Sequence, residues 1–271
     1  MQKTRARLPV LLIIITVIAS CVLRFFQLFG KISFNGNTDS YILYLLIFLC
    51  FVFAVIYSVF KKDLAETFDI SNGKKSIFLS SALLSLSFFY DFIHQGYNCY
   101  SYVSSVFYID YVYLIPMGVS GVFALISCFY FLTLALTERN ENYDFKNFTF
   151  LHFAPVVWAF SKLIGIMSQI IDVKNNVELF SEFILICITL CFLFSMISAV
   201  DKKNAGATRA FVFFSLMLTA MAFIVALPRI VLIMMDFSTF SEVTFSSVTY
   251  LMSGVFSLTI LCDINKRTKL K

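Results

Sequence analysis

The chain has 271 residues, of which 60% are hydrophobic and 14% are charged, and its formal net charge is +5. So few polar residues cannot cover the surface of a soluble globule of this length. The composition therefore excludes a soluble enzyme domain and predicts a polytopic membrane protein in contact with membrane lipids.

Eight apolar segments are long enough to cross a hydrocarbon core of about 30 Å as helices. They are residues 8–29, 41–60, 76–95, 112–136, 148–171, 179–200, 210–235 and 243–262. Helices are expected because lipid offers backbone groups no hydrogen-bond partners, and the alternating pattern of a membrane barrel is absent. The predicted fold class is all-α, a polytopic helical membrane bundle of eight transmembrane helices, with residues 1–271 forming a single integral membrane domain.

The basic residues predict the orientation of these spans. Of the 21 Lys and Arg residues, 16 fall in the segments on one side of the predicted membrane. Short cytoplasmic loops retain Lys and Arg, so both termini are predicted to be cytoplasmic at the cell membrane. The net charge then reflects attraction to the inner leaflet, and no nucleic-acid partner is expected.

The first span carries one polar face. Thr16, Ser20, Arg24 and Gln27 lie within an arc of about 80° at 100° per residue. This face is predicted to look into the bundle. In the alternative, Arg24 extends outward to the lipid headgroups, as long basic side chains near a membrane surface do.

The same segment also has features of a signal peptide. Basic residues precede an apolar run, and Ile18-Ala19-Ser20-Cys21 resembles a bacterial lipoprotein cleavage site. The apolar character continues to residue 29, and seven further spans hold the chain in the membrane without a lipid. We expect an intact first span, with a lipidated Cys21 as the alternative.

Sequence similarity between spans predicts an internal repeat. Residues 42–62 and 183–203 are identical at nine of 21 aligned positions, and the Ser-Gly-Val-Phe of residues 120–123 recurs at 253–256. We interpret this as a parallel repeat of three helices, covering spans 2–4 (about 41–136) and spans 6–8 (about 179–262). Span 5 (about 148–171) is then a linker, and the span of residues 8–29 is an N-terminal addition.

Two resemblances follow from these features. A parallel repeat of three-helix units around a linker resembles the architecture of SWEET sugar transporters and, more loosely, of sensory rhodopsins. The Pro-Gln pair of the first family and the retinal-binding lysine of the second are missing, so neither activity is implied. Arg24-Phe25-Phe26-Gln27-Leu28 resembles the N-terminal region of uncharacterised multi-pass membrane proteins of Gram-positive bacteria, which implies membrane location and no particular activity.

The third span runs into a polar segment with seven tyrosines, between Phe88 and Pro116. We predict that the helix ends near residue 95 and that the following residues form an outward-facing polar lip. Asp91 and His94 lie one helical turn apart, a spacing that suits proton transfer or ligand binding. The alternative is a solvated helix end flanked by interfacial tyrosines.

The fifth span contains the most deeply placed cation. Lys162 lies about 13 Å of helix from the outer end, a depth that calls for an acidic partner, an anionic ligand or water. His152, Pro155 and Trp158 share its face. Pro155 is predicted to kink the span beneath Lys162.

The acid expected to pair with Lys162 is Asp91 or Glu182, if the lysine serves only to hold helices together.

In the seventh span, Arg229 follows Pro228 close to the outer end. Arg24, Lys162 and Arg229 thus all fall in the outer half of the predicted membrane, which suggests a polar cavity open to the outside. The alternative is that each cation pairs with one acid and binds nothing.

The predicted ligand-binding residues combine these cations with neighbouring polar and aromatic side chains. They are Arg24, Gln27, Asp91, His94, Trp158, Lys162 and Arg229.

Small residues of spans 4 and 8, including Gly121 and Gly254, are predicted to let helices approach closely. No cofactor or metal is expected, because His94 and Cys99 are too few ligands, and no catalytic motif is present.

The sequence favours a membrane protein that binds or transports a small anionic solute. The alternative is a membrane sensor or assembly subunit that binds a protein partner or a second copy of itself through the outer lip. An enzyme is not expected.

Overall fold

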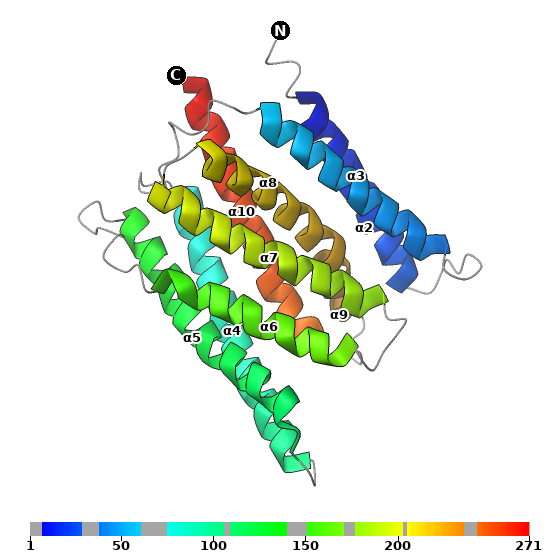
Figure 1. Cartoon of the computed structure of the whole chain (residues 1–271), viewed down its shortest axis with the longest axis vertical. Coiled ribbons are helices and arrows are strands. Elements are labelled where there is room, and N and C mark those ends of the chain that lie inside the picture. The colour runs from blue at the N-terminus through cyan, green and yellow to red at the C-terminus, as the bar shows by residue number, and fades with distance from the viewer. Residues whose placement is uncertain are drawn as a thin grey trace. The chain divides into compact units, whose positions relative to one another are not determined.

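The computed structural model describes residues 7–28, 38–60, 75–105, 109–139, 151–170, 177–202, 205–235 and 243–270. Its elements, shown in Figure 1, are α2 (Arg7–Leu28), α3 (Thr38–Phe60), α4 (Lys75–Ser105), α5 (Tyr111–Arg139), α6 (Ala154–Ile170), α7 (Val177–Lys202), α8 (Ala205–Met221), the π-helical segment η3 (Ala222–Ala226), α9 (Leu227–Met235) and α10 (Val243–Leu270). Within these ranges no strand occurs, and eight helices are long and apolar enough to cross a membrane. The predicted all-α class and the predicted number of apolar spans are confirmed.

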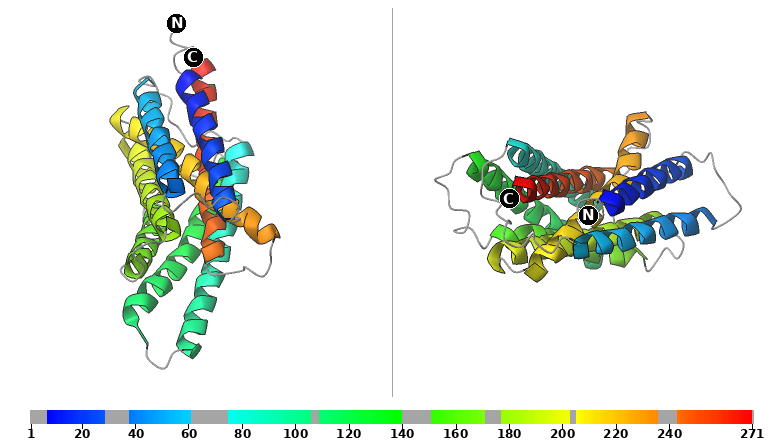
Figure 2. Two further views of the ribbon diagram at one scale, coloured as in Figure 1. Left: turned by 90° about the vertical axis from the view of Figure 1, so that its right-hand side faces the viewer. Right: turned by 90° about the horizontal axis from the view of Figure 1, so that it is seen from above.

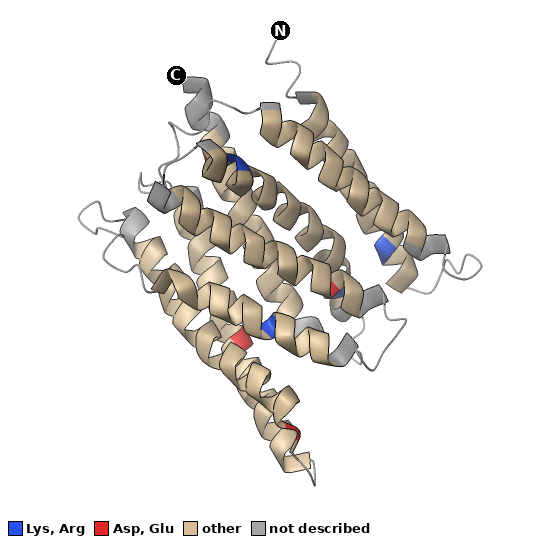
Figure 3. Cartoon of the chain, in the orientation of Figure 1, with Lys and Arg blue, Asp and Glu red and all other residues tan. Residues whose placement is uncertain are grey.

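The helices divide into two compact units. One unit comprises Met1–Phe68 and Ser195–Lys271, and the other comprises Asp69–Phe194, so the boundary falls within α7. Charged residues are sparse along the described helices (Figure 3), as a lipid environment requires.

In the unit Asp69–Phe194, α4 and α5 form a long antiparallel hairpin, and α6 packs against α5. The hairpin is seen from the side in Figure 2. Helix α4 continues to Ser105, so the prediction that the helix ends near residue 95 is wrong. Hydropathy falls beyond Gln95, but no proline interrupts the segment and α4 packs along α5, so the backbone hydrogen bonds of the helix continue.

At the tip of this hairpin, side chains of α4 and α5 contact each other and the residues that precede α5. The Asp110 carboxylate accepts a hydrogen bond from the backbone N–H of Val112 at 2.9 Å, which caps the start of α5. The backbone N–H of Asp110 donates to the Tyr102 hydroxyl at 3.2 Å, and the rings of Tyr102 and Tyr113 lie 5.2 Å apart. The predicted polar lip is therefore two helix ends with a short connection between them.

The start of α6 gives a second correction. Pro155 is the second residue of α6, which begins at Ala154. In the first turn of a helix the backbone N–H has no partner within the helix, so a proline is accommodated there without a kink. The predicted kink beneath Lys162 is wrong because the helix begins later than the apolar segment does.

In the other unit, hydroxyl and thiol groups link neighbouring helices. Helix α2 packs against α3, α3 against α8, and α8 against α10. Thr16 Oγ1 lies 3.0 Å from Cys50 Sγ, and the Thr219 and Ser257 hydroxyls lie 2.8 Å apart. Such bonds and close packing hold membrane helices together, since lipid leaves little hydrophobic drive between them.

The polar face of α2 is buried as predicted. Ser20 is fully buried, and Thr16 and Arg24 are buried as well. The Arg24 guanidinium donates a hydrogen bond to Gln27 Oε1 at 3.1 Å. The face is directed into the protein, which does not fit the alternative in which Arg24 extends to the headgroups.

A π-helical segment precedes Pro228. The N–H of Leu227 donates to the carbonyl of Ala222, five residues back, and Pro228 has no N–H. The carbonyl of Phe223 therefore receives no hydrogen bond from Leu227, whose N–H bonds to Ala222, or from Pro228. The Cys21 thiol of α2 donates to this carbonyl at 3.2 Å instead. A neighbouring helix thus satisfies a backbone group that lipid would leave unpaired.

The close approach expected of small residues is confirmed at this segment. A Cβ atom added to Gly254 of α10 would lie 2.5 Å from the Cβ of Ala222. Since carbon atoms in contact stand about 3.5–4.0 Å apart, only glycine permits this approach.

Candidate functional site

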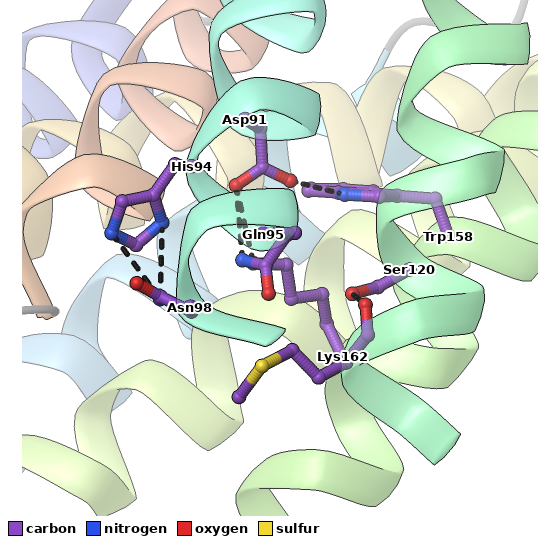
Figure 4. A network of polar contacts seen from close by, with 8 residues as sticks. Asp91, His94, Gln95, Asn98, Ser120, Trp158 and Lys162 are labelled. Carbon is purple, nitrogen blue, oxygen red and sulfur yellow. Dashed lines mark hydrogen bonds and ion pairs between the residues drawn. The ribbon is translucent and has the colours of Figure 1, made fainter. Parts of the chain in front are cut away.

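The candidate site is a buried carboxylate on α4. Asp91 is fully buried, and its two oxygens accept hydrogen bonds from three side chains. Figure 4 shows these donors around it. An ionised carboxylate out of contact with water is stable only when its lone pairs are satisfied by donors of this kind. The interpretation of Asp91 as part of a solvated helix end is therefore wrong.

Lys162 of α6 supplies the opposite charge. Its Nζ atom lies 3.2 Å from Asp91 Oδ1, so Asp91 is the partner among the two acids predicted. The Lys162 side chain is 11% exposed, whereas that of Asp91 is 0% exposed. Lys162 is thus the more exposed member of the pair.

Trp158 anchors the other carboxylate oxygen. It lies one turn before Lys162 on α6, is fully buried, and its Nε1–H donates to Asp91 Oδ2 at 2.7 Å. The ring of Phe88 meets the indole edge-on at 4.9 Å and stacks on Phe131 at 5.4 Å. The predicted shared face of Trp158 and Lys162 is confirmed, because both side chains reach the same carboxylate.

Gln95 completes the donor set and was not among the predicted site residues. Its Nε2 atom donates to Asp91 Oδ1 at 3.4 Å. A Cβ at Gly121 of α5 would lie 3.2 Å from the Cβ of Gln95, so the glycine leaves room for this side chain. The spacing of four residues from Asp91 places Gln95 on the same side of the predicted span 76–95, and this signal could have indicated it.

His94 lies on the next turn of α4 and is buried. Its two ring nitrogens lie 3.4 and 3.3 Å from the Nδ2 atom of Asn98. Figure 4 shows this pair beside the Asp91 cluster. The buried imidazole contradicts a solvated helix end at this point, while its predicted role in proton transfer stays a prediction.

A second buried polar pair lies where α5 approaches the start of α6. The Tyr130 hydroxyl and His152 Nδ1 are 2.9 Å apart, and both side chains are buried. Helical periodicity placed His152 on the Lys162 face, whereas no pattern indicated Tyr130. The Tyr130 ring also packs edge-on against Phe131 at 4.8 Å, so it belongs to the aromatic group beside Trp158.

Three predicted ligand-binding residues lie in the other compact unit. Arg24 and Gln27 lie on α2, where they are hydrogen-bonded to each other, and Arg229 is buried on α9 just after Pro228. Helix α2 packs against η3 and α9 within that unit. The grouping of these arginines with Lys162 around one outward-facing cavity stays a prediction.

Comparisons with protein-family models, curated protein sequences and solved structures give no match for this chain. Within the described ranges, no three His, Cys, Asp or Glu side chains come together as metal ligands would. The eight apolar helices define the class: this is a multi-pass membrane protein.

Proposed function

We propose that this chain binds a small anionic solute and carries it across the cell membrane, without catalysing a reaction. Both termini are cytoplasmic in this proposal, because Lys and Arg gather on that side of the sequence. Lys162 is the residue proposed to contact the solute, and the solute reaches it from outside through a polar cavity.

The observation that supports the proposal is that the Asp91 carboxylate has hydrogen-bond donors in addition to Lys162. Trp158 and Gln95 donate to its oxygens independently of Lys162, so the carboxylate keeps its position when the ammonium turns to another partner. A buried ion pair adds little net stability compared with apolar residues, so support of the fold is a weak reason for its presence. An ion pair within a membrane span is better accounted for by a solute site.

The proposal includes the three-helix repeat as the architecture of the carrier. The two Ser-Gly-Val-Phe segments lie on α5 and α10. The glycine of each segment makes a close approach to the preceding span, at Gln95 for Gly121 and at Ala222 for Gly254. This common packing role supports the correspondence of spans 3–4 with spans 7–8 within the proposed repeat.

The proposed function is tested by thermal unfolding of the purified protein with acetate, methanesulfonate, phosphate and sulfate. We expect at least one of these anions to stabilise the wild type, by about 2.7 kcal/mol at 100 times its Kd. Lys162→Met should abolish the effect. Ser161→Ala is the matched control, since the Ser161 hydroxyl only donates to its own helix at Val157. Equal responses of wild type and Lys162→Met, including no response in either, would contradict the proposal.

A second candidate function is favoured by the hairpin tip. Helix α4 carries Tyr97 and Tyr100 there, which are 67% and 74% exposed, and the sequence between Asp91 and Asp110 has no Lys, Arg, Asp or Glu. Exposed aromatic side chains free of competing charge are typical of protein contact surfaces. The alternative is a sensor or assembly subunit that binds a protein partner through the tip.

This alternative predicts a partner that co-purifies at fixed stoichiometry and is lost in the Tyr97→Ala/Tyr100→Ala variant. Each truncated aromatic anchor should weaken the association by about 2 kcal/mol. Leu86→Ala, an exposed residue of α4 away from the tip, is the control. Retention of the partner by the tyrosine variant would rule out the tip as its contact surface.

A further inference from the structure

Building on the proposed solute site, we infer that the solute anion and one proton bind together: Asp91 takes up a proton when Lys162 exchanges Asp91 for the anion. The carrier would then move an anion with a proton, and the pair Asp91–Lys162 would be the coupling element.

Charge balance at the pair leads to this inference. The fully buried Asp91 carboxylate and the Lys162 ammonium, 3.2 Å apart, sum to zero charge. An anion that entered beside Lys162 while Asp91 stayed ionised would leave one uncompensated negative charge out of contact with water. Such a charge is costly in a medium of low dielectric, and proton uptake by a carboxyl group is the usual way of avoiding it.

The donor geometry indicates which oxygen takes the proton. Trp158 Nε1–H holds Oδ2 at the short distance of 2.7 Å, whereas Oδ1 is bonded to Lys162 at 3.2 Å and to Gln95 at 3.4 Å. When the ammonium leaves Oδ1, a lone pair of that oxygen becomes available. A proton taken up from the bulk solution then forms an O–H bond at Oδ1, Lys162 keeps its three protons, and no electrons are transferred.

Gln95 is suited to both protonation states of Asp91. Its amide now donates from Nε2 to the ionised carboxylate. A side-chain amide also carries a carbonyl acceptor, so a half-turn of the group lets Oε1 accept the hydrogen bond of a protonated Oδ1.

The groups around Asp91 come from three helices. Helix α6 contributes Lys162 and Trp158, and α4 contributes Gln95 and His94. From α5, Ser120 lies beside the cluster (Figure 4) and its hydroxyl donates within its own helix to Met117. His94 is the other side chain of this group that can bind or release a proton, so the test separates its contribution from that of Asp91.

The test measures the Kd of methanesulfonate, whose own charge is constant, from its stabilisation of the purified protein between about pH 6 and pH 8, where a model carboxyl group is ionised. We expect the Kd of the wild type to rise about tenfold per pH unit, the slope for one linked proton. Asp91→Asn keeps the shape of the side chain without its charge, so its Kd should be independent of pH. A pH-indicator dye in weakly buffered solution should report about one proton taken up per anion bound by the wild type.

Three outcomes would overturn the inference. One is anion binding by the wild type without proton uptake, which leaves the proposed function intact. Another is a pH slope that survives in Asp91→Asn and disappears in His94→Gln, which assigns the proton to the imidazole. The third is no methanesulfonate response in either the wild type or Asp91→Asn, with other anions of the panel still active; failure of the whole panel would instead reject the solute site itself.

If Asp91→Asn purifies in low yield, the dye measurement on the wild type still decides the matter. In that case the anion should also rescue the variant, because it replaces the missing charge beside Lys162. Rescue by methanesulfonate but not by equal ionic strength of a bulky organic anion excluded from the site supports the inference, and equal rescue by both contradicts it.

Discussion

Replacing Asp91 by asparagine is expected to lower the free energy of unfolding by about 3–5 kcal/mol, because Lys162, whose side chain is only 11% exposed, then loses its counter-charge. The substitution keeps the size of the side chain and an acceptor for Trp158, so the loss measures charge and not packing. Chemical unfolding of the purified protein in mixed micelles provides the measurement.

The converse substitution should cost less. In Lys162→Met, the Asp91 carboxylate keeps the hydrogen bonds of Trp158 and Gln95, and it has the further option of binding a proton. The double variant Asp91→Asn/Lys162→Met removes both charges and should recover most of the stability. A coupling energy of about 2–3 kcal/mol between the two positions is expected. Strict additivity of the two single losses would show that the ion pair is not formed in the folded protein.

The span number and the helical class were predictable because lipid imposes one simple condition on the backbone. A segment that crosses the bilayer must satisfy its own N–H and C=O groups, so an apolar run of sufficient length is a helix. The helix ends were less predictable for the same reason. Beyond Gln95 the hydropathy is too low to indicate a membrane span. Helix α4 nevertheless continues to Ser105, because its backbone hydrogen bonds and its packing on α5 do not depend on polarity.

At the site, helical periodicity predicted which residues share a face of one span. It could not predict which residues of different spans are in contact. The sequence placed Trp158 and Lys162 on one face because both lie on α6. It left two acids as partners for Lys162, since no pattern within a chain states which helices are neighbours. Gln95 was missed although it lies four residues after Asp91 on the same predicted span. Tyr130 was missed because its contact with His152 depends on how α5 meets the start of α6.

Among Gly96, Gly118, Gly121, Gly165 and Gly254, the Gly254→Ala substitution is expected to be the most damaging, with a loss of about 3 kcal/mol in the free energy of unfolding. The added Cβ would lie 2.5 Å from the Cβ of Ala222 and 3.7 Å from the Leu218 carbonyl oxygen, so α10 must move away from the π-helical segment. Overpacking of this kind costs about 1–3 kcal/mol. The displacement also strains the hydrogen bonds from Thr219 to Gly254 and between Thr219 and Ser257, each worth about 0.6 kcal/mol in a membrane.

The chain offers matched controls for this prediction, because its glycines differ in how much space faces them. Gly118 has nothing within 4 Å of an added Cβ, so Gly118→Ala should be neutral or slightly stabilising, while Gly121→Ala, with Gln95 at 3.2 Å, should fall between the two. Ala222→Gly should restore most of the stability lost in Gly254→Ala, less about 1 kcal/mol for a glycine within a helix. Since the compensating change removes only the clashing methyl group, a failure to restore stability would mean that α10 and η3 do not meet at these two residues.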